Sequence, residues 1–366
     1  MKTSARGRSG LYFVSPVADA SVIGGASVVA YLLMWSFRDR IPMDSVYAAS
    51  AALLVAVNWP HFSATVYRLY HSRANVRQYP LTAIAIPFVL LGGVWASFAE
   101  PDAVAPYFVK LYLIWSPYHF SGQTLGITLL YARRANVRFS KAERFAIAAF
   151  IYGTFLLPTI AFETGRTGSD YYGVVYPALG LPVWTRQVAE VWLAGCAVAL
   201  VFIVLRWKRD GKALPPAIIL LPALTQFVWF VLGSRLRAFN EFVPMFHSLQ
   251  YLFIAWALQL KEKLDVESIT PSRRYVAWET VRWLLLNIVG GMLLFETLPL
   301  LFEMTGYPTA FVTGIIFSAV QVHHFFVDGV IWKLKSPTVS SPLMVNLSEL
   351  AGAPANVPNV PAQGIR

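Results

Sequence analysis

Long apolar segments alternate with short polar segments along almost the whole chain. Each apolar segment has the ~20 residues that an α-helix needs to cross a bilayer, and the polar segments between them are often rich in Arg and Lys. This pattern predicts an all-α, polytopic integral membrane helix bundle with about ten transmembrane helices. The predicted helices cover residues 17–37, 45–68, 79–98, 103–132, 143–162, 186–206, 213–233, 239–260, 278–304 and 307–333.

The same pattern predicts a single transmembrane domain over residues 1–335. Residues 336–366 are rich in Pro, Ala and Asn, a composition that buries little apolar surface, and we interpret them as a flexible cytoplasmic tail. The longest predicted outer connection covers 163–185. Its Gly, Tyr and Pro residues could form a lid, but we interpret it as a plain connector.

The composition supports a membrane protein. Hydrophobic residues make up 57% of the chain and charged residues 13%, against about 25% charged residues in soluble domains. A net charge of +11 would suggest a nucleic-acid partner in a soluble protein. Here 22 of the 30 Lys and Arg residues fall on one side of the predicted membrane, the cytoplasmic side by the positive-inside rule. We therefore predict cytoplasmic termini, a multi-pass protein of the bacterial inner membrane, anionic lipid headgroups as neighbours, and no nucleic-acid partner.

Five of the six His residues lie inside predicted helices, where an ionisable side chain is costly and marks a functional site. The helical rise places four of these His residues roughly 15–21 Å from the inner ends of their helices. The four are His61, His119, His247 and His323. Their helices are all predicted to run in the same direction. We therefore predict that these side chains converge on a metal near the middle of the bilayer. The five residues are His61, His119, His247, His323 and His324.

The metal type follows from the available ligands. Imidazole binds Zn, Cu, Fe and Ni, and the single Cys196 excludes a cysteine-based site. A site built from His leaves positions for dioxygen or a substrate, which favours non-haem iron, with another His-bound metal or haem as alternatives. Adjacent residues of a helix point ~100° apart, so the spacing does not decide between His323 and His324.

Polar residues follow the His residues at helical spacing. Thr65, Gln123 and Tyr251 stand four residues after their His, on the same helix face. Asp328 has the same spacing from His324. Because the second nitrogen of a metal-bound His usually has a hydrogen-bond partner, we predict that these residues orient the ligands or move protons.

We assign Thr65 and Gln123 to cofactor binding, and Asp328, Tyr251 and Glu296 to catalysis. Glu296 is predicted to be buried midway along the helix over 278–304. It is expected to be a ligand, a proton carrier, or the partner of Arg282 or Lys110.

Four His segments, in their order along the chain, resemble those of the Brp/Blh family, membrane proteins that cleave β-carotene to retinal with a non-haem iron held by His. The resemblance implies that His61, His119, His247 and His323 are iron ligands. It covers only short segments: Asn-Trp-Pro-His-Phe at 58–62, Tyr-His-Phe-Ser-Gly at 118–122, Phe-His-Ser-Leu-Gln-Tyr at 246–251, and Val-His-His-Phe-Phe-Val-Asp at 322–328.

The chain also departs from the family pattern. Thr65, and Gln123 or Thr124, stand where the family has acidic residues, and Tyr251 stands where it has a second His. These differences preserve the implied iron ligands but change the residues around them.

Together these features predict a membrane-embedded non-haem iron oxygenase that uses dioxygen and acts on a lipophilic, isoprenoid-like substrate arriving from the bilayer. Two other functions stay open. One is a haem-binding membrane electron carrier with axial His pairs. The other is a transporter or proton pathway that uses His, Asp328 and Glu296, although the chain has no evident inverted repeat of the kind common in transporters.

Overall fold

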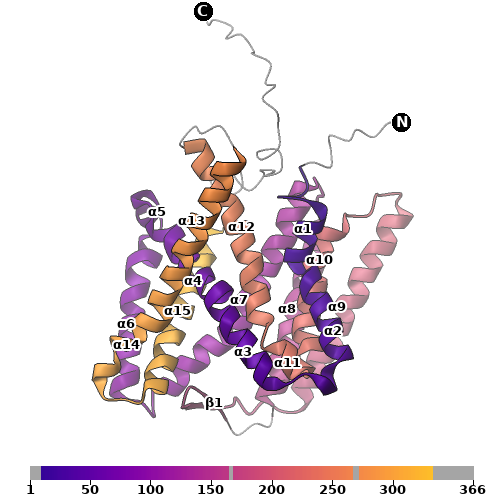
Figure 1. Cartoon of the computed structure of the whole chain (residues 1–366). Coiled ribbons are helices and arrows are strands. Elements are labelled where there is room, and N and C mark those ends of the chain that lie inside the picture. The colour runs from indigo at the N-terminus through magenta and orange to yellow at the C-terminus, as the bar shows by residue number, and fades with distance from the viewer. Residues whose placement is uncertain (1–9, 165–167, 267–271, 333–366) are drawn as a thin grey trace, which may run out of the picture.

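A computed structural model gives the structure of the chain and describes residues 10–164, 168–266 and 272–332. Long helices lie side by side and run from one end of the molecule to the other (Figure 1). Within the described residues, the strands form one two-stranded hairpin. The predicted all-α helix bundle is therefore confirmed. The predicted tail over 336–366 lies outside the described residues.

The helices differ greatly in length, and single π-helical turns join several of them end to end. These turns cover Ser21–Gly25, Leu54–Asn58, Leu81–Ala85, Val228–Leu232 and Leu293–Thr297, and 3₁₀ turns cover Arg38–Arg40, Gly233–Arg235 and Glu303–Thr305. The α-helices are α1 (Pro16–Ala20), α2 (Ala26–Ser36), α3 (Met43–Leu53), α4 (Trp59–Tyr70), α5 (Arg73–Gln78), α6 (Ile86–Ala99), α7 (Ala105–Arg134), α8 (Lys141–Glu163), α9 (Trp184–Arg209), α10 (Ala217–Phe227), α11 (Arg237–Asn240), α12 (Val243–Val266), α13 (Arg273–Met292), α14 (Leu298–Leu300) and α15 (Thr309–Ile331).

Seven helical stretches of the described chain are long and apolar enough to cross a membrane, as expected for an integral multi-pass membrane protein. Their outward side chains are apolar, and Phe88, Trp95 and Val191 each expose 70% or more of their surface. Such a surface is suited to lipid rather than water. The stretches are Pro16–Ser36, Leu81–Ala99, Lys141–Glu163, Trp184–Arg209, Ala217–Arg235, Arg273–Thr305 and Thr309–Ile331.

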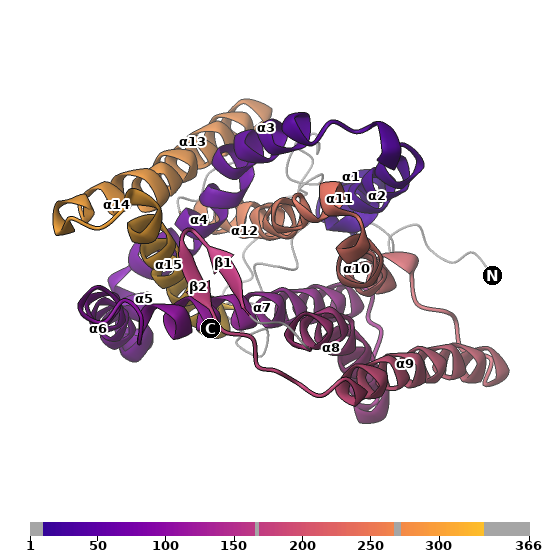
Figure 2. The ribbon, with the colours of Figure 1, turned by 90° about the horizontal axis from the view of Figure 1, so that it is seen from below.

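The other three predicted ranges, 45–68, 103–132 and 239–260, also coincide with long helical stretches. The first range corresponds to α3 and α4 together, the second to α7 and the third to α12. None of these is among the seven most apolar stretches. Figure 2 shows α4 and α12 in the middle of the bundle, with α6 and α9 at its rim. Two of the less apolar helices, α4 and α12, are therefore surrounded by more apolar ones.

The connection between α8 and α9 is not a plain connector. It forms the hairpin of β1 (Ser169–Tyr171) and β2 (Val174–Tyr176), which lies across the end of the bundle (Figure 1). Tyr172 and Gly173 have φ angles of 52° and 79°, as in the tight turns that favour hairpins. A Cβ atom at Gly314 of α15 would lie 2.9 Å from Tyr172 Cβ, so only glycine allows the hairpin to pack this closely.

A buried carboxylate holds the segment before α1 against the bundle. Asp19 is fully buried, and its oxygens accept hydrogen bonds from the backbone N–H groups of Phe13, Val14 and Ser15 at 2.7–3.2 Å. The hydroxyl of Tyr131 on α7 donates a fourth bond at 2.8 Å. Four donors therefore depend on one side chain.

We expect Asp19→Ala to lower the free energy of unfolding by about 3 kcal/mol, because four donors lose their acceptor and two of these hydrogen bonds are buried. Unfolding of the detergent-solubilised protein, followed by circular dichroism, measures the change. Asp39→Ala is the control, since the Asp39 side chain is 85% exposed. Equal effects of the two substitutions would contradict the anchoring role of Asp19.

Candidate metal centre

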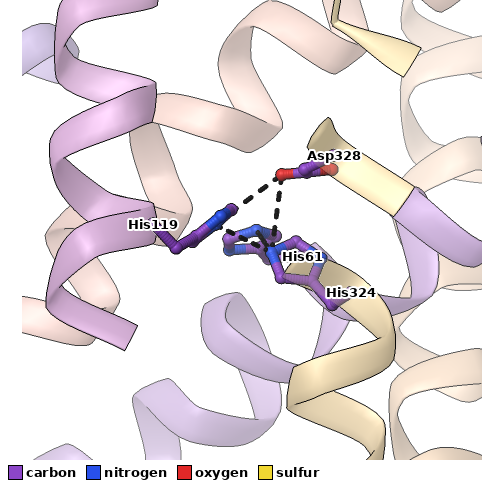
Figure 3. A group of neighbouring side chains, drawn as sticks. All are labelled: His61, His119, His324 and Asp328. Atoms are coloured by element: carbon purple, nitrogen blue, oxygen red, sulfur yellow. Dashed lines mark hydrogen bonds and ion pairs between the residues drawn. The ribbon is translucent and has the colours of Figure 1, made fainter. Parts of the chain in front are cut away.

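Three imidazoles and one carboxylate meet inside the bundle. His61 of α4, His119 of α7, and His324 and Asp328 of α15 each offer one ligand atom, and these atoms all lie within 4.8 Å of one another. We call these four residues the His/Asp cluster. Figure 3 shows their side chains pointing toward one another from three helices. The cluster is secluded, because His61 and His324 are each 1% exposed.

The local sequence explains how each helix presents its residue. His324 and Asp328 are four residues apart, so one face of α15 carries both. His61 lies in the first turn of α4, directly after Pro60 and the π-helical turn Leu54–Asn58. His119 follows Pro117, an interior proline of α7. Proline and π-helical turns change the direction of a helix locally and are frequent at functional sites.

The nitrogen atoms of the cluster are unusually close to one another. His324 Nε2 lies 2.9 Å from His61 Nε2 and 3.1 Å from His119 Nε2. A neutral imidazole nitrogen has one proton or one lone pair, so His324 Nε2 cannot make a full hydrogen bond to both neighbours. A cation between the rings would accept lone pairs from all three nitrogens.

The spacing also resembles that of metal ligands. With metal–nitrogen bonds of about 2.1 Å, neighbouring ligands are about 3.0 Å apart in an octahedral site and about 3.4 Å apart in a tetrahedral one. The nitrogen distances of 2.9 and 3.1 Å are close to the octahedral value. Asp328 Oδ2 lies 3.5 Å from His324 Nε2 and 3.7 Å from His119 Nε2, on the same side of the rings.

The two closest nitrogen pairs of the cluster leave no room for a haem between them. Two axial imidazole nitrogens lie about 4 Å apart, with the macrocycle between them, whereas these two pairs are at 2.9 and 3.1 Å.

Hydrogen bonds from neighbouring residues orient the cluster. Ser248 Oγ on α12 lies 2.8 Å from His61 Nδ1, and Asn58 Nδ2 donates a 3.0 Å bond to the same oxygen. The Thr65 hydroxyl lies 2.5 Å from Tyr251 Oη and 3.2 Å from Asp328 Oδ1. Thr65 therefore contacts the cluster through Asp328, whereas Tyr251 bonds to Thr65 and also stacks on the His61 ring, with centroids 4.2 Å apart.

Ser248 was not among the predicted residues. It follows His247 in the chain, but its contact is with His61 on another helix. The spacing of residues predicts contacts within one helix, but it does not predict a contact between residues of two helices. The nearest hint in the sequence is that Ser248 is a small polar residue next to His247.

His247 lies beside the cluster without being one of its members. Its ring stacks on Phe120 with centroids 3.8 Å apart, and lies 5.1 Å from the His61 ring and 5.2 Å from the His119 ring. The residue is 2% exposed, and neither ring nitrogen has a hydrogen-bond partner among the described residues.

His323 points away from the cluster. Its Nε2 atom lies 3.3 Å from Tyr70 Oη, and the two rings stack. The angle of ~100° between adjacent helical residues separates the two His side chains. The structure thus places His324 in the cluster, and the ligand role that the family resemblance implies for His323 does not fit its position.

Gln123 lies one turn beyond His119 on α7 but does not contact a His ring. Its Nε2 atom donates to the backbone oxygen of His247 at 3.0 Å and to Gln250 Oε1 at 3.3 Å. The residue therefore joins α7 to α12.

Glu296 lies away from the cluster, and its predicted burial is wrong, because the residue is exposed in the π-helical turn after α13. The expected ion pairs are also wrong. Arg282 pairs with Glu279 at 2.6 Å, and Lys110 pairs with Glu163. The Glu296 side chain is turned outward from this π-helical turn, which its position midway along an apolar segment does not reveal.

Two cavities adjoin the cluster. The first, of about 310 Å³, is lined by His119 and Asp328 and by largely apolar residues of α7, α8 and α15, and we call it the apolar cavity. The second, of about 180 Å³, is lined by the three His residues of the cluster, His247 and the tyrosines of the hairpin, and we call it the hairpin-side cavity. The cluster is therefore reachable from two sides.

No family model matches the chain, and neither the curated proteins nor the solved structures compared with it give a match.

We expect His324→Ala to abolish stoichiometric binding of a divalent transition metal, because His324 is the imidazole closest to both others. His323→Ala is the matched control, one residue away on the same helix, and should keep the metal. Elemental analysis of both purified variants measures the content. Loss of metal from the His323 variant alone would show that the cluster is not the metal site.

Proposed function

We propose that the chain is a membrane-embedded, non-haem iron oxygenase that acts on a lipophilic substrate. The observation that carries this proposal is the His/Asp cluster at the wall of an apolar cavity. Three imidazoles with a carboxylate suit iron, and related sets of His and carboxylate ligands are typical of non-haem iron oxygenases. The resemblance to the Brp/Blh family supports the same chemistry.

In this proposal His61, His119, His324 and Asp328 hold the iron, with His247 beside them as a further imidazole. The iron supplies the activation of dioxygen. Ser248 fixes the orientation of His61 through its 2.8 Å contact with Nδ1. Partners of this kind raise metal affinity because they hold the ring in the binding orientation.

Tyr251 and Thr65 hold Asp328 and give it a path for a proton. Tyr251 Oη is 2.5 Å from Thr65 Oγ1, which is 3.2 Å from Asp328 Oδ1. A proton can therefore pass from Tyr251 through Thr65 to Asp328 without leaving the protein interior. The catalytic role proposed for Tyr251 and Asp328 is to supply or remove protons at the cluster.

The substrate of this proposal lies in the apolar cavity and arrives sideways from the bilayer. The cavity wall includes Tyr118, which is 51% exposed on the surface of α7. Gly126 and Gly329 widen the cavity, since a Cβ atom at either would meet nothing within 4 Å. Apolar walls keep water out of the cavity that holds the substrate. An isoprenoid chain is apolar and therefore suits the apolar wall of this cavity.

We propose ten membrane spans, with both termini in the cytoplasm. Three spans are added to the seven most apolar stretches. One is formed by α3 and α4 together, one by α7 and one by α12. The start of α1 and the end of α15 lie at the same end of the bundle (Figure 1), which an even number of spans requires. The excess of Lys and Arg at that end favours the cytoplasmic side of a bacterial inner membrane and contact with anionic lipid headgroups.

A proton pathway is the second candidate function. The three Nε2 atoms of the cluster form a chain with steps of 2.9 and 3.1 Å, a spacing that suits proton transfer between imidazoles. The two functions differ in their need for metal, since only the oxygenase requires it.

We expect the protein purified in detergent to bind about one iron per chain and to consume dioxygen in the presence of a lipophilic isoprenoid, with β-carotene as the probe. Replacing His61 and His119 together by Ala should remove both the iron and the oxygen consumption. Protein free of stoichiometric metal, or metal content unchanged in the double variant, would refute the oxygenase.

We expect Gly126→Leu to lower kcat/KM for the isoprenoid by about ten-fold or more, because its side chain fills the apolar cavity. The iron content should stay unchanged, since Gly126 contacts no ligand. Gly195→Leu is the control, as a Cβ atom at Gly195 of α9 also meets nothing within 4 Å but does not line the cavity. Equal activity of the two variants would exclude the apolar cavity as the substrate site.

A further inference from the structure

The hairpin-side cavity and the apolar cavity share His119 and Phe325 but extend from the cluster toward different ends of α7. Along this helix the lining of the hairpin-side cavity runs from Tyr112 to Phe120, whereas the lining of the apolar cavity runs from Trp115 to Leu130. The two cavities therefore approach the cluster from different directions.

Polar groups are spread over the wall of the hairpin-side cavity. Asn58, Ser116, Gln321 and the hairpin tyrosines Tyr171 and Tyr172 all line it. A cavity of about 180 Å³ has room for several water molecules, each of which takes about 30 Å³ in the liquid. Water occupies a buried cavity when polar partners are present, whereas purely apolar cavities stay dry.

His247 gives the strongest indication of a ligand in this cavity. It lines the cavity, is 98% buried, and has two ring nitrogens without a partner among the described residues. A buried polar group without a hydrogen bond is unfavourable. Water in the adjoining cavity supplies a donor for one nitrogen and an acceptor for the other.

The hairpin covers the end of this cavity. Tyr171 packs against Tyr112 with ring centroids 5.4 Å apart, and Tyr172 packs against Phe317 at 5.5 Å. Tyr172 is also 43% exposed, so one residue contacts both the cavity wall and the surroundings. The close packing of the hairpin on Gly314 holds this cover in place.

We propose that the hairpin-side cavity is a binding site for water and water-sized polar solutes, and that the β1–β2 hairpin is its cap. Water and protons then reach the cluster from the hairpin end, while lipophilic molecules are confined to the apolar cavity. This site does not depend on the proposed oxygenase, because it is defined by His247 and the polar wall rather than by a metal.

Radiolytic hydroxyl-radical labelling in ¹⁸O water tests the site on the full chain without added metal. Radicals form from water in place, so a buried side chain is labelled when water lies next to it. Tyr112 should be labelled about ten times faster than Tyr131, which is on the same helix, fully buried, and outside both cavities. Equal and slow labelling of the two tyrosines, measured by mass spectrometry, would overturn the proposal.

Two variants test the water-binding role of His247 and the capping role of the hairpin separately. His247→Phe removes both unpaired nitrogens, so labelling of Tyr112 should fall several-fold while Tyr131 stays unchanged as a measure of folding. Gly314→Ala places a Cβ atom 2.9 Å from Tyr172 Cβ and should displace the hairpin, so labelling of Tyr112 should rise. Unchanged labelling in the Gly314 variant would refute the hairpin as the cap, and unchanged labelling in the His247 variant would refute His247 as the water-binding group.

Discussion

Polar groups that face the lipid of a bilayer have no water to bind, so polar side chains gather in the interior of the bundle. This constraint arranges the middle of the bundle. His61, His119, His324 and Asp328 can be buried together because each offers the others a polar neighbour. Ser248 and Thr65 then supply hydrogen bonds at the edge of the cluster. The positions of α4, α7, α12 and α15 relative to one another follow from these contacts as much as from apolar packing.

The same constraint explains why the polar helices are in the middle. A helix that carries His and Gln residues gains little from contact with lipid, whereas apolar helices such as α6 and α9 gain from it. Phe88 and Trp95 on α6 face outward with most of their surface exposed. The apolar helices thus provide the surface that faces the lipid, and the central helices carry the residues of the His/Asp cluster.

The sequence predicts helix positions well, because a long apolar segment is a strong signal that does not depend on tertiary contacts. The prediction of residues 103–132, for example, agrees closely with α7 (Ala105–Arg134). Depth along a helix is also predictable from the rise per residue. It placed His61 and His119, which meet in the cluster, at one level, together with His247 and His323, which are not members of it. The direction in which a side chain points requires the packing of neighbouring helices. For this reason the choice between His323 and His324, the exposure of Glu296 and the role of Ser248 could not be predicted.

The hairpin was missed for a different reason. Its strands have three residues each, too few for a periodic signal, and its turn places Tyr172 at positive φ, where glycine or asparagine is usual. What stabilises this turn is its contact with α15, where Gly314 leaves space for Tyr172. Tertiary contacts with α15 therefore stabilise a backbone conformation that is unfavourable for Tyr172. This segment lies at the end of a cavity that leads to the His/Asp cluster.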